Sequence, residues 1–156
     1  MLEAGTPAPN FSAPTNGGGE FTLSEQRGKF VVLYFYPKDS TPGCTVEACN
    51  FRDANAEYAA HNAVVVGVSK DSVRRHDNFV KKQELNFQLV SDADSDICEQ
   101  YGTWVKKKMY GKEYMGIARA TFLVGPEGDI LHVWPKVSVK AHADEVLDTL
   151  RTHSKK

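Results

Sequence analysis

The feature that most constrains the fold is a run of seven apolar or aromatic residues, FVVLYFY, at positions 30–36. A strand of a half-exposed sheet alternates apolar and polar side chains, whereas this run offers apolar side chains to both faces. Proline follows at position 37 and ends the run. We therefore expect a central strand that is covered on both faces, with helices supplying the covering layers.

Other segments continue an alternation of strands and helices. The apolar run AVVVGV at 63–68 predicts a second buried strand, and FQLV at 87–90 predicts a third. Helix-forming residues without Gly or Pro occupy positions 45–61, and Ser72 is placed to cap a helix that runs toward Glu84. A strand, a loop and a helix thus follow one another repeatedly, as in an α/β domain.

Two turn-rich segments predict antiparallel strand pairs. One contains the three glycines of TNGGGE, and the other is GPEGD at 125–129. The expected pairs are 11–14 with 21–23, and 119–124 with 130–134. The first pair is an N-terminal β-hairpin, and the second makes the main sheet mixed.

The last periodic segment predicts an amphipathic helix, because its apolar residues recur at helical spacing. These residues are Ala143, Val146, Leu147 and Leu150, and the end of the chain from Ser154 to Lys156 is expected to fray. With 156 residues, the length fits one domain. We predict that residues 1–156 form a single thioredoxin-like three-layer α/β domain with a central mixed sheet and an N-terminal hairpin.

The charge balance argues against two classes of partner. The chain has 19 Lys and Arg residues against 20 Asp and Glu residues, which gives no broad basic field for a nucleic acid. No run approaches the roughly 20 apolar residues of a membrane-spanning helix. The N-terminal residues do not resemble a signal or transit peptide, so we expect a cytoplasmic protein with no nucleic-acid or membrane partner.

Sharper interpretations of three segments fail on their residues. A phosphate-binding loop needs Gly-Lys-Ser/Thr after its glycines, but Glu20, Phe21 and Thr22 follow here. The acidic segment at 92–96 has neither the glycine nor the final glutamate of a calcium loop. The five histidines are scattered without metal-ligand spacing and are expected at the surface, so no metal or other cofactor is expected.

One of the three cysteines occupies a position suited to chemistry. Cys44 follows the loop at 37–43, between the most apolar strand and the next helix. In the first turn of a helix, unpaired backbone N–H groups and the helix dipole stabilise a thiolate. A structural, buried cysteine is the alternative. The loop residues Pro37, Pro42 and Gly43 favour an accessible, nucleophilic thiol.

The segment YFYPKDSTPGCTVEAC at 34–49 resembles the active site of the peroxiredoxins, in particular the peroxiredoxin Q or bacterioferritin comigratory protein subfamily. The similarity covers nearly the whole chain and includes CEQYG at 98–102 and GIARATFL at 116–123. The resemblance implies a thioredoxin-like fold. It also implies thiol-dependent reduction of hydrogen peroxide and organic hydroperoxides, usually with thioredoxin as the electron donor.

The resemblance also assigns roles to individual residues. Cys44 is the attacking thiolate, and the hydroxyl of Thr41 either accepts from the thiol or donates to the peroxide. Arg119 contacts sulfur and peroxide, and without the family context it reads as a solvated charge at a strand end. Pro37 shields the sulfur and shapes the loop. Glu47 either orients Arg119 or simply lies in an acidic helical turn.

The oxidised sulfur of Cys44 has to be captured before it reaches the inactive sulfinic state. Cys49 is the candidate for this capture. Other members of the subfamily place a resolving cysteine on the following helix, but here residues 71–88 contain no cysteine. On an intact helix, Cα atoms five residues apart lie on the order of 8.6 Å from each other. A disulfide tolerates at most about 6.8 Å. We therefore expect the helix to unwind around residues 44–49 in each cycle.

Cys98 lies in a short helical segment beside Ile97 and Tyr101, and we expect a buried, structural thiol there. A resolving or intermolecular role for Cys98 stays open at this point, as do glutaredoxin and glutathione as reductants. A disulfide oxidoreductase would need Cys-x-x-Cys, whereas Cys44 and Cys49 are spaced Cys-x4-Cys. The last alternative is a non-catalytic redox sensor or holdase. We expect a monomeric, thioredoxin-dependent two-cysteine peroxidase.

Overall fold

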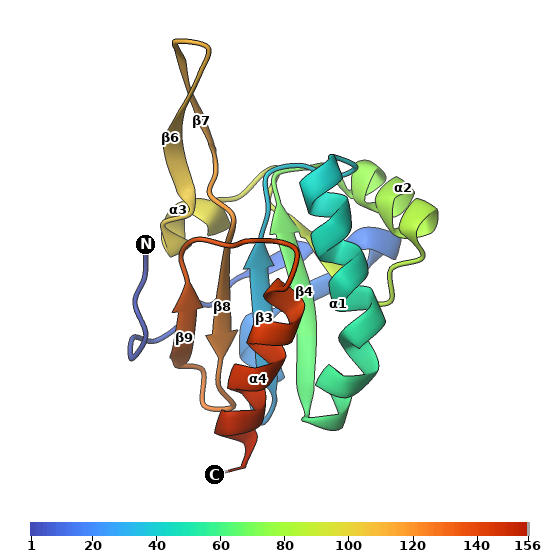
Figure 1. The fold of residues 1–156 in the computed structure, drawn as a ribbon, viewed down its shortest axis with the longest axis vertical. Coiled ribbons are helices and arrows are strands. Elements are labelled where there is room, and N and C mark those ends of the chain that lie inside the picture. The colour runs from blue at the N-terminus through green and yellow to red at the C-terminus, as the bar shows by residue number, and fades with distance from the viewer. Residues whose placement is uncertain (156) are drawn as a thin grey trace.

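The molecule is built around a five-stranded mixed sheet, seen in a computed structural model that describes residues 1–155 (Figure 1). From edge to edge its strands are β5 (Gln88–Ser91), β4 (Ala63–Ser69), β3 (Phe30–Phe35), β8 (Ala120–Val124) and β9 (Ile130–Trp134). β3 pairs in parallel with β4 and antiparallel with β8. β5 extends the parallel part and β9 extends the antiparallel part, which confirms the predicted mixed sheet.

β3 is the central strand that its apolar run predicts, and all six of its residues are buried. Alternate side chains enter two separate cores because successive residues of a strand point to opposite faces. Val31, Leu33 and Phe35 belong to one core, and Val32 and Tyr34 to the other.

Different elements cover the two faces of the sheet. Helices α1 (Pro42–Ala60), α2 (Val73–Gln83) and α4 (His142–Ser154) contribute buried side chains to the core that contains Tyr34. The opposite core is closed by the hairpin β1 (Ser12–Pro14) and β2 (Glu20–Thr22), with α3 (Ile97–Tyr101). Two 3-10 helices, η1 (Asn16–Gly18) and η2 (Leu23–Gln26), flank β2. The three-layer α/β arrangement is as predicted, but one covering layer is a β-hairpin with a short helix, where helices were expected on both faces.

Helix boundaries differ slightly from those expected. α1 begins at Pro42 rather than at position 45, since proline is favoured in the first turn, where its missing N–H is not needed. Cys44 therefore lies in the first turn, as predicted. The hydroxyl of Ser72 accepts a hydrogen bond from the Arg75 N–H at 3.2 Å, which confirms the predicted cap of α2. α4 still includes Ser154, so fraying does not begin there, and Lys156 lies outside the described residues.

A further hairpin, β6 (Trp104–Met109) and β7 (Lys112–Ile117), was not predicted from the sequence. Figure 1 shows it projecting from the body of the molecule beyond α3. Tyr110 and Gly111 form its two-residue turn with φ angles of 51° and 77°, as a type I′ turn requires. The Tyr110 side chain is 97% exposed.

The expectation that the histidines lie at the surface is wrong for two of them. His76 and His142 are 0% and 1% exposed. His142 Nε2 lies 2.7 Å from Thr121 Oγ1, and burial, together with the charge of Arg119, lowers the pKa of His142 to about 4. Both nitrogens of His76 and Nε2 of His142 have hydrogen-bond partners distant in the sequence, which allows burial.

None of the helices formed by the described residues is long and apolar enough to span a bilayer.

Candidate active site

Cys44 meets Arg119 because two neighbouring strands place them together. The loop and first helical turn after β3 carry Cys44, and Arg119 directly precedes β8. Antiparallel pairing of these strands sets Phe35 opposite Ala120, so the residues next to this pair adjoin the same end of the sheet. Arg119 Nη2 donates to Cys44 Sγ at 3.2 Å, across 75 residues of sequence.

The same guanidinium also binds Glu47. Arg119 Nη1 donates to Glu47 Oε1 at 2.6 Å. Glu47 follows Cys44 by three residues, so both side chains lie on one face of α1. Arg119 thus uses its two terminal nitrogens to bridge sulfur and carboxyl, a geometry that the planar fork of arginine allows. The structure brings together Cys44, Glu47 and Arg119.

Glu47 is an unusual carboxyl group because its side chain is 1% exposed. Burial raises its pKa to about 7, although the charge of Arg119 and its hydrogen bond act in the opposite direction. Among the described residues, its second oxygen, Oε2, has no hydrogen-bond partner. The carboxyl is therefore held on one side only.

Arg119 remains charged in this setting. Partial burial of its guanidinium lowers its pKa, but Glu47 and Cys44 together outweigh burial, and the pKa is raised above its ordinary value. A permanent positive charge next to the sulfur stabilises a thiolate, and the same N–H groups suit an oxygen that gains negative charge.

The expectation of an accessible Cys44 thiol is wrong, because Cys44 is only 1% exposed. Arg119, which directly precedes β8, covers the first turn of α1. A Cβ atom added at Gly43 in this turn would lie 3.3 Å from Arg119 Nη2. Loop composition could not reveal this cover. A local displacement of the guanidinium or of the loop would be needed for any small molecule to reach the sulfur.

Thr41 and Pro37 lie in the loop before Cys44. Thr41 is the N-cap residue of α1, and its hydroxyl donates to the Lys38 carbonyl oxygen at 2.8 Å. Its single proton is thus engaged within the loop, and a side-chain rotation has to precede any donation to a peroxide. Pro37 is half-buried and lines a pocket with Trp104 and Tyr114 at the base of the β6–β7 hairpin.

The other two cysteines differ sharply. Cys49 is half-buried, and its thiol donates to Gln83 Oε1 of α2 at 3.6 Å. Cys98 is 0% exposed, as expected of a structural thiol, and burial, with Asp92 beside it, raises its pKa far above the ordinary value. All three cysteines are free thiols, and α1 is continuous between Cys44 and Cys49.

Comparison with known proteins places this site in a family. The AhpC/TSA family model matches residues 4–133. Peroxiredoxin Bcp of Bacillus subtilis is 46% identical, and the alignment covers 99% of both chains. The chain belongs to the peroxiredoxin family.

Solved peroxiredoxin structures share the fold. The bacterioferritin comigratory protein of Xanthomonas campestris, described for its alkyl peroxide reduction activity, superimposes with a TM-score of 0.91. It is 43% identical, and the match covers 97% of this chain and 99% of that one. A cysteine-to-serine mutant of Xylella fastidiosa PrxQ gives a TM-score of 0.92 at 40% identity, covering 99% and 98% of the chains. The peroxiredoxin resemblance, the thioredoxin-like fold and thiol peroxidase activity are thereby confirmed.

Sequence reasoning missed a group of polar residues behind the loop of this peroxiredoxin. Asp39 is 3% exposed and contacts His76, which comes from α2. Asp39 lies in the loop that follows the central strand β3, and such loops are where functional side chains gather in α/β sheets, so its position is a signal visible in the sequence. For His76 no such signal exists, because its partner lies 37 residues away.

Proposed function

We propose that this peroxiredoxin reduces hydrogen peroxide and organic hydroperoxides to water and alcohols, with Cys44 as the attacking thiolate. The contact of Arg119 Nη2 with Cys44 Sγ at 3.2 Å carries this proposal. A fixed positive charge favours the thiolate and lies where the leaving oxygen gains charge. The alkyl peroxide reduction described for the Xanthomonas campestris relative supports organic hydroperoxides as substrates.

In the first step the Cys44 thiolate attacks the terminal peroxide oxygen. The S–O bond forms as the O–O bond breaks, so sulfur is oxidised to sulfenic acid and the leaving group becomes an alkoxide or hydroxide. This ion takes up a proton and leaves as alcohol or water. Arg119 stabilises the charge, Glu47 orients Arg119, Thr41 donates a hydrogen bond after rotating, and Pro37 limits access to the sulfur.

In the second step Cys49 resolves the sulfenic acid. Its thiolate attacks Cys44 Sγ, the S–S bond forms as the S–O bond breaks, and the sulfenic oxygen leaves as hydroxide, which takes up a proton to become water. Because α1 is continuous through both residues, helical geometry separates their Cα atoms by about 8.6 Å, which exceeds the range of a disulfide. The segment between them must therefore unwind before the bond forms.

The third step needs an external dithiol. A disulfide exposed by an unwound turn can be attacked by the thiolate of a small redox protein, and thioredoxin is the proposed reductant. We place the reaction in the cytoplasm, in a monomer whose residues 1–156 form one domain, without metal or other cofactor. Glutaredoxin and glutathione are the competing reductants to compare.

Turnover by three cysteine variants tests the proposal. With thioredoxin and its reductase supplied, Cys44→Ser should lose peroxide reactivity. Cys49→Ser should complete one reduction and then fail to recycle efficiently, and Cys98→Ser should remain nearly unchanged. Retained peroxide reactivity in Cys44→Ser would refute the assignment. Equal damage in Cys98→Ser and Cys49→Ser would refute the choice of resolving residue.

A further inference from the structure

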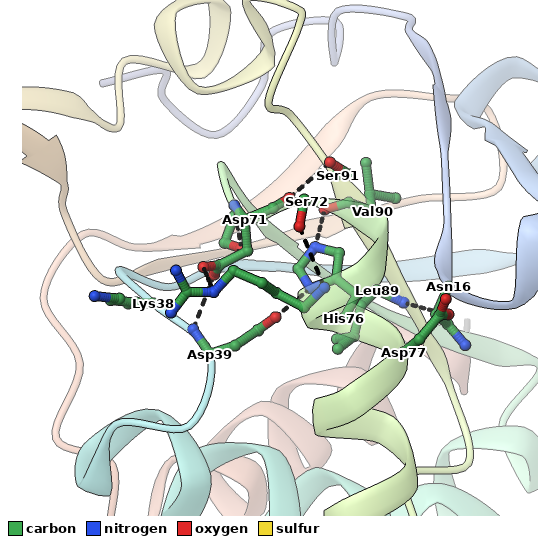
Figure 2. A network of polar contacts seen from close by, with 12 residues as sticks. Asn16, Lys38, Asp39, Asp71, Ser72, His76, Asp77, Leu89, Val90 and Ser91 are labelled. Atoms are coloured by element: carbon green, nitrogen blue, oxygen red, sulfur yellow. Dashed lines mark hydrogen bonds and ion pairs between the residues drawn. The ribbon is translucent and has the colours of Figure 1, made fainter.

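A buried polar network lies behind the loop that precedes Cys44 (Figure 2). Asp39, in that loop, places its Oδ2 atom 2.6 Å from His76 Nδ1 of α2. The hydroxyl of Tyr36 donates to the other oxygen of Asp39. The side chains of Asp39 and His76 are almost fully buried, at 2% and 0% exposure. The mechanism proposed above uses neither residue.

The contact between Asp39 and His76 contains a shared proton. His76 Nε2 lies 2.9 Å from the Val90 carbonyl oxygen, which only accepts, so Nε2 carries a hydrogen. The 2.6 Å contact at Nδ1 then joins either an imidazolium to a carboxylate or an imidazole to a carboxylic acid. In both arrangements one proton lies between Nδ1 and Oδ2, and the pair is neutral overall. A neutral, hydrogen-bonded pair is the form in which such groups are tolerated in an interior.

The backbone of Asp39 is anchored as well. Its N–H donates to Asp71 Oδ2 at 2.8 Å, and Ser69 Oγ donates to the same oxygen at 2.7 Å. Arg75 Nε approaches the other oxygen of Asp71 at 3.3 Å. Asp39, Asp71 and His76 offer ligand atoms within 4.8 Å of one another, but each of these groups already has a protein partner. The cluster therefore anchors the loop to α2 and to Asp71.

The anchored residue, Asp39, lies next to a strained residue of the loop. Ser40, the next residue, has φ of 65°, in the left-handed region that a non-glycine residue adopts only under constraint. The residues on either side of Asp39 and Ser40 also matter chemically. The Lys38 carbonyl accepts from the Thr41 hydroxyl, and Thr41 is the N-cap residue of the helix that carries Cys44. Fixing Asp39 thus fixes the approach of the chain to the sulfur.

Helix α2 contacts both the loop before Cys44 and the thiol of Cys49. α2 holds the loop before Cys44 through His76 near its start, and Gln83 at its end accepts from the Cys49 thiol. Arg52 of α1 also donates to the Gln83 carbonyl at 2.6 Å. α2 is therefore a common support for the loop and for the segment that must unwind.

We propose that Asp39 and His76 are positioning residues whose contact holds the loop at 37–41 in the peroxide-reactive arrangement and is released when the helix unwinds toward the Cys44–Cys49 disulfide. This inference rests on the proposed function. Loss of the contact favours the unwound form, in which Thr41 and Arg119 no longer surround the sulfur. Peroxide reduction then slows, while the sulfenic acid meets Cys49 more often. A second peroxide consequently converts less of it to sulfinic acid.

Asp39→Asn tests this, because asparagine keeps the size of the side chain but cannot share the proton in the same way. The matched control is Asp77→Asn on the same helix, whose carboxylate accepts from the Gly17 N–H at 2.7 Å and faces away from the loop. Stopped-flow fluorescence gives the rate constant for peroxide reduction, and intact mass gives the ratio of sulfinic acid to disulfide as peroxide is raised.

We expect roughly a tenfold lower rate constant for Asp39→Asn and a several-fold lower sulfinic fraction. Asp77→Asn should stay within about twofold of the wild type in both. An unchanged rate constant, or a slower reaction with an unchanged ratio of sulfinic acid to disulfide, overturns the inference. Wild-type turnover measured alongside separates the two proposals, because a wild type that fails to consume peroxide overturns the proposed function itself.

Hydrogen exchange of the wild type decides the matter if Asp39→Asn does not fold. The Asp39 amide, bonded to Asp71, should be protected in the reduced enzyme and exchange faster in the disulfide form. The Gly17 amide, bonded to Asp77, should exchange equally in both. Equal protection of the Asp39 amide in the two forms overturns the inference.

Discussion

At the scale of single residues, Arg119 joins the parts of the site. One guanidinium donates to Cys44 Sγ and to Glu47 Oε1, and it also covers the sulfur. An ammonium group is a point charge, so it cannot hold both partners in one plane. Charge alone is therefore insufficient here, and the shape of the cation matters.

Arg119→Lys should lower the second-order rate constant for peroxide reduction by tenfold or more, since it keeps the charge and loses the bridge. Stopped-flow mixing of the reduced enzyme with hydrogen peroxide measures the effect. The control is Arg151→Lys. Arg151 forms an exposed ion pair with Glu57, so this variant should leave the rate unchanged. A lysine variant within about twofold of wild type would show that the bridge is unimportant.

Glu47→Gln should remove a pH dependence of stability. The pKa of this carboxyl is about 7 in the folded protein and 4.5 in the unfolded chain. Between these two pH values the folded protein therefore holds a proton that the unfolded chain has released. The wild type therefore loses stability as the pH rises through this window, by on the order of 2 to 3 kcal/mol.

Urea unfolding at pH 5 and pH 8 measures the effect, with Glu57→Gln, an exposed carboxyl on the same helix, as control. The free energy of unfolding of Glu47→Gln should fall less between the two pH values than that of the wild type. Parallel changes in the two proteins would mean that Glu47 is already ionised at pH 5.

At the scale of elements, the proposed cycle requires two incompatible states of α1. Continuous helix places Cys44 under Arg119, whereas a 44–49 disulfide needs a shorter separation than helix geometry allows. The first turns of α1 therefore carry the conformational change, and the later turns, which bury Phe51 and Tyr58, remain packed.

Oxidation of the Cys98→Ser variant by one equivalent of peroxide should reduce its helical circular dichroism by roughly two turns, because a helix has about 3.6 residues per turn. Dithiothreitol should restore the signal. The Cys49→Ser, Cys98→Ser double variant is the control and should keep its helix on brief oxidation. A disulfide between residues 44 and 49 without loss of helix would contradict the unwinding step.

The sheet has its own tight contact beneath α1, at Gly67 of β4. A Cβ atom added there would lie 2.8 Å from Leu89 and 2.9 Å from the Tyr34 ring. Gly67→Ala should cost about 1 to 3 kcal/mol of unfolding free energy through overpacking. In a Leu89→Ala background the penalty should shrink, because one of the two obstructing side chains is then removed and only the Tyr34 ring remains. Equal penalties in urea unfolding would show that Leu89 is not the obstacle.

At the scale of the whole molecule, sequence patterning predicted the strands whose two faces are both buried. β3 is apolar throughout and β4 is apolar up to its last residue, Ser69, and the turns flanked by strands marked both predicted hairpins. β6 and β7 escaped because most of their residues face solvent and carry no core pattern. Their turn, Tyr110–Gly111, also lacks the Asn-Gly or Asp-Gly signature of a two-residue loop.

The site was predictable to a smaller extent. Position in the chain indicated Cys44, but Arg119 depended on the family resemblance, since nothing local marks a residue that acts 75 positions away. Burial of Cys44, His76 and His142 was missed for the same reason. Each is enclosed or satisfied by groups that only the tertiary fold brings near.

The enclosure of Cys44 by Arg119 also bears on chemical selectivity. A thiol covered by its own cation is screened from bulky electrophiles such as maleimides, which have to push the guanidinium aside and gain little from its N–H groups. A small peroxide can pass under the guanidinium and accept hydrogen bonds from those same N–H groups. We therefore expect the guanidinium to select among attacking reagents before any bond forms, so that the proposed reactive sulfur of Cys44 is poorly available to general alkylation.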